Sequence, residues 1–285
     1  MSDYAALLDA LRALRWPARR PVRGGAPGAH HARTRGVSVE FTEYRPYRQG
    51  DDPRRIDWKL LARSDRAYIR LSTDRAVLPT TIVVDASASM AFPLDSLGKW
   101  CQAQRLAVGI AAVVHAQSDP VGLVLVTSAG TRTLAPRTRR GVVGELARTM
   151  DEATPGGSAP IAPALRALGG GRVVIVTDLL ADGEAMLREG ARIIAAGGDA
   201  HAVHVVAREE LEPRGRALLA VDPEDETIRR PLDADARPAY ERAFAEWRDA
   251  TARAWRAAGA GYTMVVDDEP TERAVRRIVT GAAAP

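Results

Sequence analysis

An uninterrupted apolar run that ends on a carboxylate is the feature that most constrains the fold of this chain. Residues 81–84 read Thr-Ile-Val-Val, and Asp85 follows directly. β-Favouring residues without polar alternation are typical of a strand that is buried on both faces, as in a parallel sheet. Residues 172–177 repeat the pattern and lead into Asp178. The two runs together predict a buried, mostly parallel sheet.

Helix-like and strand-like patterns alternate over the 200 or so residues that follow residue 78. Apolar spacing predicts helices at 97–117, 140–151, 161–168, 183–196, 236–258 and 269–279. Apolar runs predict further strands at 121–127, 200–207 and 262–266. The turn at 128–130 predicts a short edge strand at 131–134, and an acidic hairpin is predicted at 218–232. Alternation of this kind predicts an α/β fold, a doubly wound, mostly parallel sheet with Rossmann-type layers.

The part of the chain before residue 78 has a different character. Residues 3–15 place one tyrosine and four leucines on a single stripe, which predicts a short helix. Residues 17–36 are rich in Pro, Gly and Arg, as linkers are. Residues 37–72 contain short β-type pieces around a Gly-Asp-Asp-Pro turn. The predicted domains are a helical and basic leader with linker at 1–36, a small β-rich segment at 37–77, and an α/β domain at 78–285.

Composition restricts the class of protein and its compartment. An apolar share of 46% in 285 residues fits a soluble globular chain. Cys101 is the only cysteine, so no intrachain disulfide can form and a reducing compartment is expected. The longest uncharged apolar stretch, residues 106–116, is shorter than the roughly 20 residues that span a bilayer. Because the amino terminus also lacks a signal-peptide pattern, we expect a cytoplasmic protein without a membrane span.

Basic residues are nearly all arginine, and several gather at the start of the chain. Lys59 and Lys99 are the only lysines, which we attribute to the coding bias of a GC-rich genome. The first 35 residues carry seven arginines against two acidic residues, Asp3 and Asp9. A basic leader of this kind can bind nucleic acid or anionic lipid. However, Trp16 is the only aromatic residue among its arginines that could stack on a base, and the segment matches no nucleic-acid recognition module. A solvated leader is the favoured interpretation, and nucleic-acid binding is kept as an alternative.

Oxygen-bearing side chains collect at the predicted carboxyl ends of the two buried strands. Asp85, Ser87 and Ser89 close one strand at every second residue, and Asp178 closes the other. In a doubly wound sheet, such strand ends line one crevice. Ser158 lies on a Gly-Gly loop whose flexibility would let its hydroxyl reach the same point. Carboxylates and hydroxyls are ligands that Mg²⁺ prefers, so these five residues predict a divalent-cation site.

Two other interpretations of these residues stay open. The serines can cap following helices and the aspartates can simply end strands. A strand-end carboxylate with Mg²⁺ is also similar to phosphoryl-transfer enzymes of the haloacid dehalogenase kind, but those need a second Asp where this chain has Ser87. No Gly-x-x-x-x-Gly-Lys-Ser/Thr loop is present, which argues against NTP hydrolysis. A metal-dependent hydrolase is therefore kept as an alternative, and no catalytic residue is predicted.

One constellation resembles the metal-ion-dependent adhesion site of von Willebrand factor type A domains: Asp85-x-Ser87-x-Ser89, the hydroxyl of Ser158, and Asp178 in Val-Thr-Asp. The resemblance extends over roughly residues 78 to 280. The loop hydroxyl in that family is usually threonine, and serine keeps the oxygen here.

The resemblance implies a non-enzymatic protein-binding site. In such sites the hydroxyls of Ser87, Ser89 and Ser158 would contact Mg²⁺, or Mn²⁺ or Ca²⁺ in its place. Asp85 and Asp178 would hold the cation directly or through water. An Asp or Glu of a protein partner would take the open coordination position.

A second motif precedes this one and resembles the signature of domain-of-unknown-function family fifty-eight. It reads Arg35-Gly36-x-Ser38-x-Glu40-Phe41, then Tyr44-Arg45-x-Tyr47-x-x-Gly50-Asp51-Asp52-x-Arg54-x-Ile56-Asp57-Trp58, then Ala62-Arg63. Members of that family carry a type A domain behind the signature and are often encoded beside MoxR-type AAA+ ATPases. The resemblance implies an adaptor or co-chaperone-like partner of such an ATPase or of its client.

The signature also supplies a set of candidate interface residues: Arg45, Tyr47, Asp51, Asp52, Arg54, Asp57, Trp58 and Arg63. The alternative for this segment is a brace that ties it to the α/β domain.

Overall fold

The computed structural model describes residues 4–19, 27–31, 41–49, 51, 53–72, 75–213, 219–221, 227, 229–231 and 236–281. The chain divides into two compact units, and each is described by itself. The first unit combines Met1–Trp16 with Pro79–Pro285, and the second comprises Pro17–Leu78. This division differs from the predicted domains, because the first 16 residues belong with the α/β unit rather than with a separate leader.

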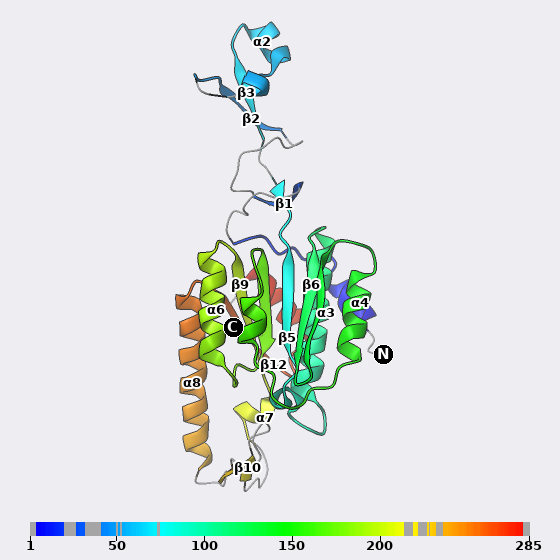
Figure 1. Cartoon of the computed structure of the whole chain (residues 1–285), viewed down its shortest axis with the longest axis vertical. Helices are drawn as coiled ribbons and strands as arrows, with labels where there is room; N and C mark the ends of the chain where they lie inside the picture. The colour runs from blue at the N-terminus through cyan, green and yellow to red at the C-terminus, as the bar shows by residue number, and fades with distance from the viewer. Residues whose placement is uncertain are drawn as a thin grey trace. The chain divides into compact units, whose positions relative to one another are not determined.

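A six-stranded sheet forms the centre of the first unit (Figure 1). The strand order is β12-β9-β8-β5-β6-β7, and every neighbouring pair is parallel except β6 with the edge strand β7. The strands are β5 (Thr80–Asp85), β6 (Val121–Thr127), β7 (Gly130–Arg137), β8 (Arg172–Thr177), β9 (Asp199–Val206) and β12 (Gly261–Val266). The predicted α/β class with a doubly wound, mostly parallel sheet is confirmed.

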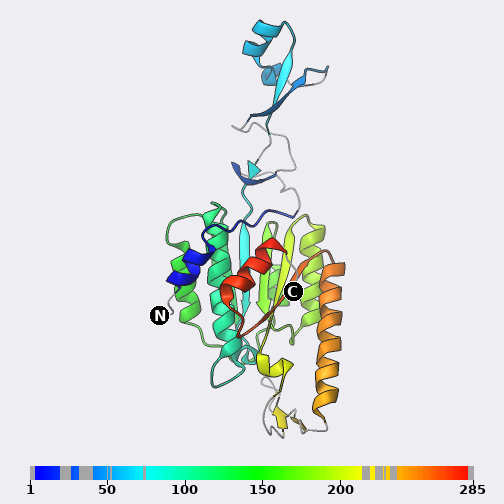
Figure 2. The same cartoon turned by 180° about the vertical axis from the view of Figure 1, so that it is seen from behind.

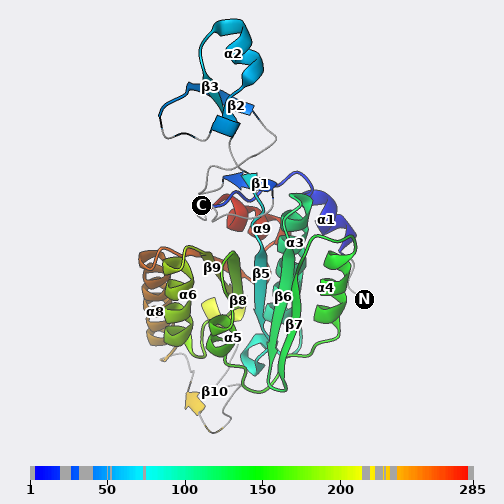
Figure 3. The same ribbon diagram turned by 45° about the horizontal axis from the view of Figure 1, so that its top comes forward.

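Helices cover both faces of this sheet. One face carries α1 (Ala5–Leu11), α3 (Gly98–Ala116), α4 (Val142–Asp151) and α9 (Thr271–Thr280), of which α1 and α9 lie in front in Figure 2. The other face carries α5 (Ala162–Arg166), α6 (Gly183–Ala195) and α8 (Arg237–Ala257), which Figure 3 shows together on the opposite side. Between β9 and α8 the chain forms the short helix α7 (Arg208–Leu211) and a hairpin of β10 (Leu219–Val221) and β11 (Arg229–Pro231).

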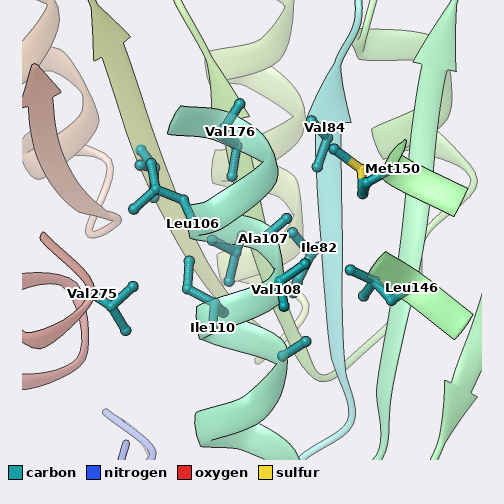
Figure 4. Packing of buried hydrophobic residues seen from close by; sticks show 14 of the residues in the cluster. Ile82, Val84, Leu106, Ala107, Val108, Ile110, Leu146, Met150, Val176 and Val275 are labelled. Atoms are coloured by element: carbon teal, nitrogen blue, oxygen red, sulfur yellow. The ribbon is translucent and has the colours of Figure 1, made fainter. Parts of the chain in front are cut away.

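The central strand β5 contributes to two separate hydrophobic cores because its side chains alternate between the faces. Ile82 and Val84 pack in the cluster on the α3 side, and Val83 packs in the cluster on the α6 side. Figure 4 shows Ile82 on the side of Ala107 and Val108 of α3, with Val84 near Met150 of α4 in the same cluster. Because both faces are covered, the strand can be apolar throughout, which explains why its sequence shows no polar alternation.

Truncation of Leu106 to alanine is expected to lower the free energy of unfolding by about 2–5 kcal/mol, because its side chain is fully buried in this cluster. The matched control is Leu94→Ala, since Leu94 is 79% exposed and its truncation should change stability by no more than about 0.5 kcal/mol. Chemical denaturation followed by circular dichroism measures both. Equal losses in the two variants would contradict the assigned core.

The amino-terminal segment is held to the first unit by buried contacts. Leu11 and Trp16 are buried in the α3-side cluster, and the Tyr4 hydroxyl donates to Asp151 Oδ1 at 2.9 Å. The carbonyl of Trp16 accepts hydrogen bonds from both terminal nitrogens of Arg172 at 3.3 Å. The guanidinium of Arg172 also stacks over the Trp16 ring at 4.0 Å. These contacts hold residues 4–16 to the first unit.

The second unit is small and built from paired short strands. β1 (Pro27–His31) pairs with β4 (Arg75–Ala76), and β2 (Phe41–Pro46) pairs with β3 (Tyr68–Ser72). A 3₁₀ turn at Pro53–Arg55 and the helix α2 (Trp58–Ser64) connect β2 to β3. β2 and β3 lie in the predicted β-rich segment, whereas β1 falls within the predicted linker and α2 was not predicted. Its start is defined by Asp57, which accepts hydrogen bonds from the amides of Lys59 and Leu60 at 3.0 Å each.

Replacing Asp57 by alanine should destabilise α2 by about 1 kcal/mol, because two amides of its first turn lose their acceptor. Asp57→Asn keeps a side-chain oxygen at the cap and should cost much less. Amide hydrogen exchange in α2 is the appropriate measurement, since it reports opening of this helix separately from the α/β unit. Faster exchange in both variants to the same degree would contradict the capping role.

Along the described parts of the chain, none of the helices combines the length and apolarity needed to cross a bilayer.

Candidate metal centre

The carboxylate of Asp85 lies at the carboxyl end of β5 in a buried and fully bonded position. The side chain is 2% exposed, Oδ1 accepts from the amide of Ser87 at 2.8 Å, and Oδ2 accepts from the hydroxyl of Thr177 at 2.7 Å. Thr177 ends the neighbouring strand β8, so the two adjacent strand ends are joined directly. These bonds fix the orientation of the carboxylate at the predicted edge of the sheet.

The hydroxyls of Ser87 and Ser89 lie together directly after this strand. Both serines are buried, and their Oγ atoms are 3.0 Å apart. Ser87 precedes a single 3₁₀ turn at Ala88–Ala91, and its side chain does not cap that turn. The capping interpretation of Ser87 is therefore not what the structure shows. The turn instead directs two hydroxyls toward each other beside Asp85.

The loop that carries Ser158 is attached to the same segment by backbone hydrogen bonds. The amide of Ala88 donates to the carbonyl of Gly157 at 2.8 Å, and the amide of Gly156 donates to the carbonyl of Ala86 at 2.9 Å. Gly157 has a φ of +64°, and a Cβ there would lie 2.6 Å from Cβ of Ser128. Glycine is thus needed for this close approach rather than for a flexible hinge. Ser158 follows Gly157 directly, and its side chain is exposed.

Asp178 is paired with a buried lysine that the sequence analysis did not assign to the site. Lys99 Nζ donates to Asp178 Oδ2 at 2.8 Å and to Glu210 Oε1 at 2.8 Å. Lys99 is fully buried near the start of α3, and Glu210 belongs to α7. The other oxygen of Asp178 accepts from the amide of Leu180 at 3.2 Å. The ammonium therefore neutralises part of the negative charge at this edge.

The charges of this cluster do not balance. Burial, together with the nearby negative charge of Asp178, raises the pKa of Asp85 to about 6, against hydrogen bonds from Thr177 and Ser87 that lower it. Burial acts to lower the pKa of Lys99, but the carboxylates of Asp178 and Glu210 raise it above its ordinary value.

Among the described residues, Asp85, Asp178 and Glu210 thus bring three carboxylates to this edge of the sheet, and Lys99 brings one ammonium. Ionisation of all three leaves two negative charges in excess, which is the charge that one divalent cation would neutralise.

The residues present fit a hard divalent cation. Adjacent ligands of an octahedral Mg²⁺ with bonds of about 2.1 Å lie about 3.0 Å apart, which is the separation of the two serine hydroxyls as well as a normal hydrogen-bond distance. All donors are oxygen atoms, and Asp85 supplies a charged oxygen beside them. Among the described residues no group of three or more His, Cys, Asp or Glu side chains is placed to hold a metal, so any site here depends on the hydroxyls.

Three residues of this cluster were missed by sequence reasoning: Thr177, Lys99 and Glu210. The partners of Lys99 lie 79 and 111 residues away along the chain, so no local sequence pattern predicts these ion pairs. One signal existed. Lys99 is one of only two lysines in an arginine-rich chain, and it lies in an otherwise apolar helical pattern.

The signature residues that the structure describes lie in the second unit. Some of them form contacts within that unit, and others are exposed. Arg45 forms an ion pair with Asp51 at 2.8 Å, and the amide of Arg48 also donates to Asp51, so both interactions hold the pKa of that carboxyl below its usual range. The amide of Tyr47 donates to the carbonyl of Ala67 at 2.8 Å. These residues stabilise the turn between β2 and α2.

The remaining signature residues are more accessible. Trp58 is 63% exposed at the start of α2, and Arg54 and Arg63 are exposed as well. Asp57 accepts from the Tyr44 hydroxyl at 2.9 Å in addition to capping α2. Asp52 and residues 35–40 of the signature lie outside the described residues. An exposed tryptophan and arginines are typical of a protein interface, and that role stays a prediction.

Comparison with protein families identifies the group to which this sequence belongs. The family described as "Protein of unknown function DUF58" matches residues 43–250. The chain belongs to this family. The match begins in the second unit and extends into α8, so it covers the signature from Tyr44 onward and most of the α/β unit of this DUF58 protein.

Similar sequences and structures are known. "Uncharacterized protein Mb1516" of Mycobacterium bovis and "Uncharacterized protein Rv1480" of Mycobacterium tuberculosis are each 30% identical over 272 residues, which is 90% of this chain and 84% of theirs.

Among solved structures, BatB from Bacteroides thetaiotaomicron has a TM-score of 0.43 at 14% identity, covering 72% of this chain and 98% of that one. The SpRpn10 VWA domain has a TM-score of 0.37 at 11% identity, covering 72% and 96%. At these scores no conclusion about this chain follows.

Proposed function

We propose that this DUF58 protein is a non-enzymatic, divalent-cation-dependent protein-binding module. The observation that carries the proposal is the pair of buried hydroxyls of Ser87 and Ser89, 3.0 Å apart, beside the under-neutralised carboxylate of Asp85. These three side chains would hold Mg²⁺, or Mn²⁺ or Ca²⁺ in its place, with Asp178 adding negative charge and Ser158 a further hydroxyl on the attached loop. A cation bound there would supply an open position for a carboxylate of the partner.

Neutral hydroxyl ligands are the reason why an acidic partner is favoured. A cation that is held largely by hydroxyls keeps more of its positive charge than one surrounded by carboxylates. It therefore attracts an outside Asp or Glu. The partner proposed on the family resemblance is a MoxR-type AAA+ ATPase or its client, which this chain would serve as an adaptor or co-chaperone-like subunit.

The surroundings of the serines support binding rather than hydrolysis. The two histidines of β9 are buried, His201 bonded to the hydroxyl of Thr263 at 3.0 Å and His204 to the hydroxyl of Tyr262 at 2.6 Å. His204 also interacts with Asp178, which acts to raise the pKa of the ring against the effect of burial. Burial also lowers the pKa of His204 to about 4, so its ring is neutral at neutral pH. Neither contact positions a base against Ser87 or Ser89.

A capture experiment tests the proposal. The full chain is immobilised and exposed to the purified MoxR-type ATPase of the same genome in MgCl₂ or in EDTA. We expect capture in MgCl₂, loss in EDTA, and loss in the Asp85→Ala, Ser87→Ala double variant.

The control is Asp249→Ala, which removes an exposed carboxylate on α8 and should leave capture unchanged. Capture that is equal with and without EDTA, and equal in the double variant, would contradict cation-dependent binding.

A further inference from the structure

Lys99 is the one buried ammonium at this edge of the sheet within the described residues. A positive side chain beside a proposed cation site is unusual, because the two positive charges repel. Its Nζ lies 2.8 Å from Asp178 Oδ2 and 2.8 Å from Glu210 Oε1, and the side chain is 1% exposed. The ring of Phe92 lies 5.9 Å from the same nitrogen. Desolvation of a charge is costly, so an ammonium is kept here only because two carboxylates surround it.

An internal ammonium and a bound divalent cation compete for the same carboxylate. Asp178 already directs one oxygen to Lys99 and the other to the amide of Leu180. Thr177, the residue directly before Asp178, donates to Asp85 Oδ2 at 2.7 Å, so the ammonium and a cation held at Asp85 lie at two adjoining strand ends. Two positive charges near one another in a buried setting repel more strongly than they would in water.

We propose that Lys99 is a positioning residue that weakens the intrinsic affinity of the Asp85–Ser87–Ser89 cluster for a divalent cation by keeping Asp178 in an internal ion pair. The inference rests on the proposed function, because it concerns the same cluster. Because the charge of Asp178 is partly neutralised by Lys99, the partner's carboxylate then supplies the negative charge that stabilises the bound cation. The cation and an acidic partner consequently bind with mutual dependence, each raising the affinity for the other.

The test measures the affinity of the full chain for Mn²⁺ in the absence of any partner. Electron paramagnetic resonance gives the concentration of free Mn²⁺ in each titration. Lys99→Met keeps an unbranched side chain of similar length and removes the charge. We expect it to bind Mn²⁺ at least about tenfold more tightly than the unmodified chain. The matched control is Lys59→Met, which removes the only other lysine, exposed on α2, and should leave the affinity unchanged.

A second substitution identifies the carboxylate involved. Asp178→Asn in the Lys99→Met background should abolish the gain in Mn²⁺ affinity. In the unmodified chain, the same Asp178→Asn change should lower the affinity less than it does in the Lys99→Met background, because Lys99 already neutralises part of the charge of that carboxylate. This double-mutant cycle assigns the coupling to the pair rather than to a general loss of positive charge.

Lys99→Met leaves two buried carboxylates without their ammonium, so folding requires its own control. The Lys99→Met, Glu210→Gln variant removes one carboxylate together with the ammonium and should also bind Mn²⁺ more tightly. Thermal unfolding with and without Mn²⁺ gives a second readout, in which both variants should be stabilised more than the unmodified chain.

The outcomes separate the two proposals. Unchanged or weaker Mn²⁺ binding in the folded Lys99 variants would overturn the role of Lys99. If the Asp85→Ala, Ser87→Ala variant loses Mn²⁺ binding in the same experiment, the cation site itself still stands. Absence of Mn²⁺ binding from the unmodified chain and from every Lys99 variant would overturn both proposals.

Discussion

Replacing Arg172 by methionine is expected to lower the free energy of unfolding by about 3–5 kcal/mol. The side chain is fully buried and pairs with Asp199 at 3.3 Å. Its terminal nitrogens donate to the carbonyl of Trp16, and its guanidinium stacks on the Trp16 ring. Methionine fills a similar volume but leaves a partly buried carboxylate and a backbone carbonyl without these donors. The loss should therefore be among the largest of any single substitution in the chain.

The matched control is Arg166→Met. Arg166 pairs with Glu189 at 3.2 Å, but its side chain is 70% exposed, so water replaces the interaction and little change in stability is expected. Urea denaturation compares the two variants. Proteolysis should also show that the segment ending at Trp16 becomes accessible in Arg172→Met alone. Similar small losses in both variants would contradict the role of Arg172 in holding the amino-terminal segment.

Thr177→Val is expected to weaken Mn²⁺ binding by about 10–100-fold while leaving the fold intact. The Thr177 hydroxyl donates to Asp85 Oδ2 at 2.7 Å, and valine keeps the shape of the side chain but not this bond. Partners that orient a ligating carboxylate typically contribute this much to metal affinity. The same hydroxyl accepts from the amide of Leu179 at 3.1 Å, so some local stability should be lost as well.

Thr263→Val provides the control for this prediction. Thr263 is a buried threonine of β12 in the same sheet, and its hydroxyl contacts His201 rather than the cluster. Its replacement should leave the Mn²⁺ affinity unchanged. A titration of each folded variant with Mn²⁺ distinguishes the two. An unaltered affinity in Thr177→Val would show that Asp85 does not need this bond to act as a ligand.

The sheet and its order of elements could be predicted because burial on both faces imposes a local pattern. Ile82, Val83 and Val84 lie in two cores on opposite faces, and an uninterrupted apolar run is the direct result. The structures of α2 and of the amino-terminal segment were harder to predict from the sequence. α2 has seven residues and no buried side chain, so no apolar stripe marks it, and Asp57 was its main local signal.

The candidate site was predictable only where its residues follow a strand end. Asp85, Ser87 and Ser89 are close in sequence, and the structure brings the loop of Ser158 against them. The ion pair of Asp178 with Lys99 depends on how α3 packs against β8, which no local pattern contains. Sequence reasoning therefore found the oxygens and missed the ammonium that neutralises part of their charge.

The assignment of Trp16 shows the same limit. Its position before a proline indicates the end of a helix, but its burial depends on Arg172, which lies 156 residues later. Likewise, β7 extends over Gly130–Arg137 although a strand was predicted only at 131–134. Its pairing with β6 continues beyond residue 134, as far as Arg137.

The most direct test of the central claim is a titration of the full chain with Mn²⁺, compared with the Asp85→Ala, Ser87→Ala double variant. The claim is that Asp85, Ser87 and Ser89 form a divalent-cation site. We predict one Mn²⁺ site in the unmodified chain, displaced by Mg²⁺, and no site in the double variant, with both proteins folded by circular dichroism. No binding to the unmodified chain, or equal binding to both proteins, would contradict it.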